Sequence, residues 1–122
     1  MKRNFLGAAI CFLALIACSK SFRLVLPEDA TVLNWIDKNY VLGQSHPISP
    51  EGHTAVENWL AQNQNGWKPY LVTVPASGIF IRAKTFSLQI TRSSALLYIN
   101  EDVYSKGLSG SVGAALLAAN DA

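Results

Sequence analysis

Cysteine is scarce in this chain, and its placement rules out a disulfide framework. The 122 residues contain two cysteines, Cys11 and Cys18, and Cys11 lies inside a continuous apolar stretch near the N-terminus. If that stretch is removed, a single cysteine remains and no intrachain disulfide can form. The fold of the remaining residues must then depend on a hydrophobic core. Their aromatic and aliphatic side chains are sufficient for one such core and one domain.

A marked excess of one charge is also missing. The chain has 10 Lys and Arg against 8 Asp and Glu, and two of the cations, Lys2 and Arg3, precede the apolar stretch. Without these two residues the charges balance. A neutral domain gives no electrostatic argument for nucleic acid as a partner, so we expect none.

The chain lacks an apolar run long enough to cross a bilayer. The uncharged run from Phe5 to Ala17 covers roughly 13 residues, whereas a membrane-spanning helix needs about 20. A run of this length behind Lys2 and Arg3 is typical of a secretion signal. The sequence therefore predicts a signal peptide over residues 1–17, and not a transmembrane anchor.

The end of the run carries a specific motif. It reads Leu15-Ile16-Ala17-Cys18 and resembles the lipobox of bacterial lipoproteins. The resemblance implies cleavage between Ala17 and Cys18 and long acyl chains on Cys18, which would hold the protein on a membrane. The residue after the lipid-bearing cysteine is Ser19 and not Asp. By the same resemblance, in Gram-negative lipoproteins this implies release to the outer membrane and not retention at the inner one. The protein would then face the periplasm from the inner leaflet of the outer membrane. No cofactor is expected beyond this covalent lipid.

The predicted mature chain divides into three parts. We expect residues 18–21 to form the lipidated N-terminus and a short tether, and residues 22–105 to form a single domain. Residues 106–122 are expected to be either a flexible Gly/Ala-rich tail or a short C-terminal helix, because glycine weakens a helix that is not docked. A tether this short would keep the domain close to the membrane.

Two segments have helical patterns. The first begins at Pro27, continues with apolar residues at helical spacing and ends at Gly43. In the second, Ser49 is a natural N-cap and Pro50 suits the first helical position, which predicts a helix near residues 50–64.

The pattern then changes to the two-residue period of β-strands. We expect strands over residues 70–74, 79–84, 86–90 and 95–99, joined by short turns that favour an antiparallel meander of about four strands. The predicted fold class is α+β, with one or two helices packed on one face of this sheet.

Alternation along these strands predicts which side chains face the helices and which face water. The face toward the helices is expected to carry Ile79, Ile81, Phe86, Leu88 and Ile90, and the face toward water to carry Arg82, Lys84, Ser87, Gln89 and Thr91.

Candidate catalytic chemistry is sparse. His53 and Glu57 are four residues apart on the predicted second helix and, with His46, provide three groups for a metal or a base–acid pair. The ordinary alternative is an exposed helix pair worth a few tenths of a kcal/mol. We expect the alternative, and therefore neither a metal site nor an enzyme. The stretch from Gly107 to Gly113 lacks the spacing of a phosphate loop or a nucleophile elbow and is expected to be a flexible linker.

The aromatic residues divide between core and surface. Trp59 shares the apolar stripe of the second helix and is expected in the core. Trp67 and Tyr70 flank Lys68 and Pro69, and are expected either to close the core or to form an exposed rim suited to an interface.

The segment from Val56 to Trp67, followed by two hairpins, resembles a pattern in small proteobacterial envelope lipoproteins of unassigned activity. The resemblance implies a shared fold and no catalytic residues. The leading hypothesis is a lipid-anchored, non-catalytic protein-binding module, for example an immunity protein or an inhibitor of a periplasmic toxin or wall-cleaving enzyme.

Two other functions stay open. An accessory subunit of an envelope assembly or secretion machine fits the same features, and a small envelope hydrolase using His53, Glu57 and His46 is less favoured. Candidate partner-binding residues are Arg82, Lys84, Gln89, Trp67 and Tyr70.

Overall fold

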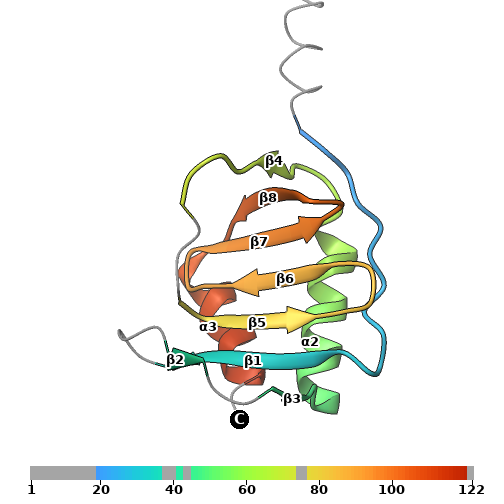
Figure 1. Cartoon of the computed structure of the whole chain (residues 1–122), viewed down its shortest axis with the longest axis vertical. Coiled ribbons are helices and arrows are strands. Elements are labelled where there is room, and N and C mark those ends of the chain that lie inside the picture. Colours follow the sequence, from blue (N-terminus) through green and yellow to red (C-terminus); the bar gives the residue numbers. More distant parts are fainter. Residues whose placement is uncertain (1–18, 37–40, 43–44, 74–76, 121–122) are drawn as a thin grey trace, which may run out of the picture.

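The computed structural model describes residues 19–36, 41–42, 45–73 and 77–120. The predicted signal peptide, residues 1–17, and the predicted lipid attachment at Cys18 lie outside these residues. The described chain forms one antiparallel sheet with helices on one of its faces (Figure 1), which confirms the α+β class.

The sheet has eight strands over the described ranges, in the order β2-β1-β5-β6-β7-β8-β4, with β3 paired to β1 outside this order. All pairs are antiparallel. The strands are β1 (Thr31–Ile36), β2 (Val41–Leu42), β3 (His46–Pro47), β4 (Lys68–Pro69), β5 (Ile79–Arg82), β6 (Ser87–Ile90), β7 (Ser94–Ile99) and β8 (Asp102–Gly107). The expected meander is present in β5 to β8, but the expected total of about four strands is wrong.

The predicted helix that begins at Pro27 is wrong, because β1 occupies Thr31–Ile36. Thr31 and Val32 are β-branched and fit the pleated surface of a sheet. Val32 lies directly opposite Ile81 of β5, and both are fully buried. Pairing with the edge of β5 therefore decides the conformation of a segment whose local pattern fits a helix as well.

The predicted strand over residues 70–74 is also misplaced. The strand in this region is β4 (Lys68–Pro69), and Tyr70 to Thr73 lie beyond it as a loop, while Val74 is outside the described residues. Pro69 has no N–H to donate, which confines such a segment to a short strand at a sheet edge. The Tyr70 N–H still donates to the Val103 carbonyl at 2.8 Å, so the start of the loop is fixed to β8.

Helix α2 (Pro50–Gln62) confirms the second helical prediction. The Ser49 side chain accepts from the Gly52 N–H at 3.0 Å and caps the helix, and Pro50 occupies its first turn. The apolar stripe packs on the sheet, with Val56, Trp59 and Leu60 buried.

Helix α3 (Gly110–Ala119) decides between the two alternatives for the C-terminal residues. Its N-cap is Ser109, whose side chain accepts from the Val112 N–H at 3.3 Å. Gly107 is the last residue of β8, so the expected flexible linker from Gly107 to Gly113 is wrong. Gly113 packs against the backbone of Arg92 in the β6–β7 turn, which docks this glycine-containing helix on the sheet.

The core lies between the sheet and the two helices. All five residues that alternation assigns to the helix-facing side are buried: Ile79, Ile81, Phe86, Leu88 and Ile90. This confirms the predicted orientation of β5 and β6. Leu26, ahead of β1, and Leu116 of α3 complete the same core.

Candidate partner-binding surface

The sheet has a second face, opposite to α2 and α3. Directly paired residues of antiparallel strands share a face, so the register defines two rows of side chains that run across the strands. The first row holds Thr31, Arg82, Ser87, Tyr98 and Val103, and the second holds Leu33, Phe80, Gln89, Leu96, Ser105 and Lys68. Figure 1 shows both helices behind the sheet in this view, with the second face toward the reader. We call these two rows the second face.

The predicted exposure of Gln89 is wrong, because this side chain is fully buried. Its amide donates to the Ser77 carbonyl at 3.1 Å, and its side-chain oxygen accepts from the Tyr98 hydroxyl at 2.9 Å. Gln89 also lies between Phe80 and Leu96 in the cross-strand row. The nitrogen and the oxygen of the Gln89 amide therefore both have hydrogen-bond partners within the protein. Because the side chain is also buried, it cannot contact a binding partner.

Thr91 is buried for a different reason. It belongs to the β6–β7 turn, where its hydroxyl accepts from the Ser94 N–H at 3.1 Å. The expectation that it faces water is therefore also wrong, and its side chain stabilises the turn.

An aromatic pair occupies the centre of the second face. The rings of Phe80 and Tyr98 are 5.2 Å apart at an angle of 46°, and both side chains are half-buried. Burial raises the pKa of the Tyr98 hydroxyl above its ordinary value, and the neighbouring Tyr70 adds to the rise. The second face is thus more apolar than the five polar residues predicted for it suggest, because Phe80, Leu96 and Tyr98 also belong to it.

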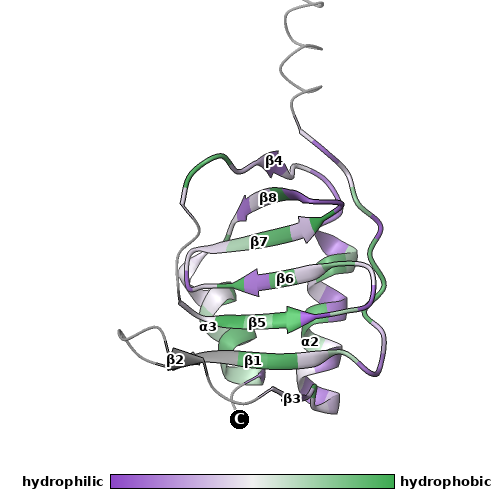
Figure 2. Cartoon of the chain, in the orientation of Figure 1, coloured by the Kyte–Doolittle hydropathy of each residue, from purple (hydrophilic) through white to green (hydrophobic). Residues whose placement is uncertain are grey.

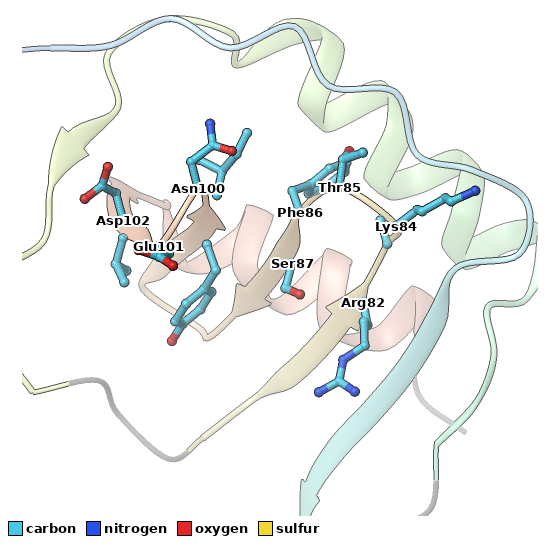
Figure 3. A pocket seen from close by; sticks show the side chains of 12 residues that line it. Arg82, Lys84, Thr85, Phe86, Ser87, Asn100, Glu101 and Asp102 are labelled. Carbon is cyan, nitrogen blue, oxygen red and sulfur yellow. The ribbon is translucent and has the colours of Figure 1, made fainter.

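A shallow depression of about 390 Å³ continues from this face, between the β5–β6 and β7–β8 turns (Figure 3). The two predicted residues Arg82 and Lys84 line one side of it and are exposed, as expected. Glu101 and Asp102 line the other side. The depression therefore presents cations and anions on opposite walls, an arrangement that suits a polar protein surface with both charges.

The β7–β8 turn beside this depression has unusual backbone geometry. Asn100 and Glu101 have φ values of 52° and 69°, the left-handed conformation of a two-residue hairpin turn. Asparagine tolerates this conformation, whereas glutamate rarely adopts it. Glu101 is thus held in a strained turn with its side chain at the depression.

The two remaining predicted aromatic residues differ in position: Trp67 lies in the core, whereas Tyr70 lies beside Tyr98. Trp67 is fully buried, its indole N–H donates to the Asn63 carbonyl at 2.8 Å, and its ring meets Trp59 edge-on at 5.8 Å. Of the two alternatives for this pair, core packing holds for Trp67. Tyr70 is half-buried, with its hydroxyl bonded to the Thr73 carbonyl at 3.0 Å.

The histidine pair joins α2 to the chain ahead of β1. One ring nitrogen of His53 bonds the Leu26 carbonyl at 2.7 Å, and the other lies 3.5 Å from a Glu57 carboxylate oxygen. Both ring nitrogens therefore face oxygen acceptors. His46 instead bonds the Pro47 carbonyl next to it. In the described ranges, no three His, Cys, Asp or Glu side chains are grouped as a metal site would require.

The chain is bonded to the domain from its first described residues onward. The N–H of Lys20 donates to the Trp67 carbonyl at 2.7 Å, and the Trp67 N–H donates back at 3.1 Å. The Ser21 hydroxyl donates to the Asn65 side-chain oxygen at 2.8 Å. Two residues of the predicted tether are therefore held against the domain, close to Cys18 in the sequence.

Comparison of the chain with protein-family models, with curated proteins and with solved structures found no significant match. Neither of the described helices, α2 nor α3, has the length and apolar character needed to cross a membrane. Function must therefore be inferred from the geometry of the described residues.

Proposed function

We propose that this protein is a lipid-anchored, non-catalytic module that binds a protein partner at the periplasmic side of the bacterial outer membrane. The observation that carries the proposal is the second face. The two described helices, α2 and α3, cover the opposite side of the sheet, while Phe80 and Tyr98 are half-buried and Arg82 is exposed on the second face. Aromatic residues and arginine are enriched at the centres of protein interfaces.

The membrane part of the proposal depends on the lipobox-like motif that ends at Cys18. Two or more acyl chains there would keep the module at the bilayer and raise its local concentration for partners that reach the membrane. This arrangement suits an immunity protein or an inhibitor of a periplasmic toxin or wall-cleaving enzyme. It also suits an accessory subunit of an envelope machine, and the identity of the partner separates the two.

The test is recovery of partners by crosslinking in the native envelope, using the tagged full chain and two charge reversals. Arg82→Glu alters the second face, whereas Arg92→Glu reverses an exposed arginine in the β6–β7 turn, at the other end of β6. We expect Arg82→Glu to lower partner recovery about 10-fold or more, as loss of an interface hot spot would. Lys84→Glu, at the rim, should have a milder effect.

A recovered toxin or wall-cleaving enzyme would support the inhibitor version, and a component of an assembly machine would support the accessory role. Equal recovery with Arg82→Glu and Arg92→Glu would contradict the use of the second face. All variants should keep the wild-type melting temperature, because these side chains are exposed.

A further inference from the structure

Two neighbouring aliphatic side chains in the loop after β4 are exposed to solvent. Leu71 is 92% exposed and Val72 is 68% exposed, and Figure 2 shows a hydrophobic stretch of the chain there. The base of this loop is fixed, because the Tyr70 N–H bonds Val103 of β8 and the Tyr70 hydroxyl bonds Thr73. Leu71 and Val72 therefore form a small exposed apolar site on a fixed base, which is available for contact with another molecule or a membrane.

The loop lies at the end of the molecule where the described chain begins (Figure 1). Lys20 is paired with Trp67, and Leu71 follows Trp67 by only four residues. Four extended residues span at most about 14 Å. Cys18 precedes Lys20 by two residues, so a lipid on Cys18 would bring the bilayer within reach of Leu71.

Charged residues of both signs surround this end. Lys20 and Lys68 are exposed, and Lys106 donates to a backbone carbonyl beside them. Glu101, in the β7–β8 turn, and Asp102, the first residue of β8, are exposed. Because these charges partly cancel, burial of apolar surface must supply most of any affinity for lipid, with only a small contribution from anionic headgroups.

We propose that the loop after β4 lies directly on the bilayer, with Leu71 and Val72 entering the headgroup region of the membrane that carries the anchor. This inference rests on the proposed lipid at Cys18, which places a bilayer at this end of the domain. The aromatic Tyr70, at the base of the loop, has the amphipathic character of side chains that lie at membrane interfaces. The domain would then be held at two points, the acyl chains and the loop, and its orientation on the membrane would be fixed.

The test uses the full lipidated chain in vesicles of phosphatidylethanolamine and phosphatidylglycerol. With Cys11 removed in the signal peptide and Cys18 acylated, Leu71→Cys provides a single thiol for an environment-sensitive fluorophore. Thr54→Cys is the matched control, because Thr54 is exposed in α2, whose first turns lie at the end of the domain away from β4 (Figure 1). Neither substitution should affect folding, since both side chains project into water.

We expect the label at position 71 to be blue-shifted and quenched by quenchers attached to lipid, and the label at position 54 to stay in a water-like environment. Water-like spectra at both positions in vesicle-bound protein would overturn the proposal while leaving the anchor intact. If Cys18 carries no lipid, the chain will not remain with the vesicles and its intact mass will show no acyl chains. These two measurements distinguish a missing anchor, which would contradict the proposed function, from an anchored protein whose loop does not enter the bilayer. A photo-crosslinker at position 71 that captures a protein in the native envelope, and no lipid, would also overturn the proposal.

Discussion

Replacing Gly113 by alanine should weaken the packing of α3 on the sheet. A Cβ atom built at this position would lie 2.2 Å from the Arg92 carbonyl oxygen and 2.7 Å from its carbonyl carbon. Both are backbone atoms of the β6–β7 turn, so no side chain can rotate away to make room. The helix or the turn must shift by about an ångström, which would loosen the packing of Leu116 and Asn120, both now buried.

The expected size of this effect follows from two opposing terms. Overpacking of a close contact costs about 1–3 kcal/mol, whereas alanine gains up to about 1 kcal/mol over glycine within a helix. We therefore expect Gly113→Ala to lower the free energy of unfolding by about 1–2 kcal/mol. For a domain of this size that corresponds to a fall in Tm of roughly 4–16 °C.

The assay is thermal unfolding of the purified protein, followed by circular dichroism. Gly110→Ala is the matched control, since a Cβ there meets nothing within 4 Å. It lies in the same helix and should leave Tm unchanged or raise it. If the Tm of Gly113→Ala equals or exceeds that of Gly110→Ala, then α3 is not docked on the β6–β7 turn and the reasoning is refuted.

Four further outcomes are expected. Trp59→Ala should cost about 3–5 kcal/mol in chemical denaturation, because this ring is buried against another indole; a loss below about 1 kcal/mol would mean that it is not core. Glu101→Gly should stabilise the protein by up to about 1 kcal/mol, since it relieves a left-handed glutamate after Asn100, and an unchanged or lower Tm would argue against the strained turn. The pKa of the Tyr98 hydroxyl is raised from 10.0 in the folded state, so the folded protein keeps this proton to higher pH than the unfolded chain does. The contribution of the protonated hydroxyl to the free energy of unfolding is fully present below pH 10 and is lost as pH rises through the folded pKa. Tyr98→Phe should therefore flatten the fall in stability above pH 10. Cys18→Ala should abolish acyl labelling and leave a larger precursor; a lipidated product of this variant would refute the assignment of Cys18.

Local signals were sufficient to predict α2 but not β1. Ser49 and Pro50 cap and start α2 through contacts within a few residues, so the sequence alone specifies where that helix begins. In β1, the apolar spacing fits both a helix and a strand over such a short length. Its conformation is decided by Ile81, far along the chain, which lies opposite Val32. Contacts of this kind are not visible in the local pattern.

The candidate surface was predicted only in part, for a related physical reason. Alternation correctly placed Arg82 and Lys84 in water, but it treats every polar residue on the outer face as exposed. Gln89 is buried because Tyr98 and the Ser77 carbonyl satisfy its side chain. A usable signal was present: Phe80 and Tyr98 alternate with core residues in their strands, so their rings had to lie on the outer face. The exposure of Leu71 and Val72 was not predicted, because the apolar pattern of residues 70–74 also fits a strand.

The two proposals together fix how a partner would approach. Strand β4 is at one edge of the sheet, and both the first described residues and the loop with Leu71 lie at that edge. If this edge rests on the bilayer, the strands stack outward from the membrane in the order β8, β7, β6 and β5. The plane of the sheet is then upright, and the second face points along the membrane surface. A partner that binds Phe80, Tyr98 and Arg82 would therefore lie beside the domain and close to the bilayer, where an inhibitor of a toxin or enzyme that acts at the membrane has to work.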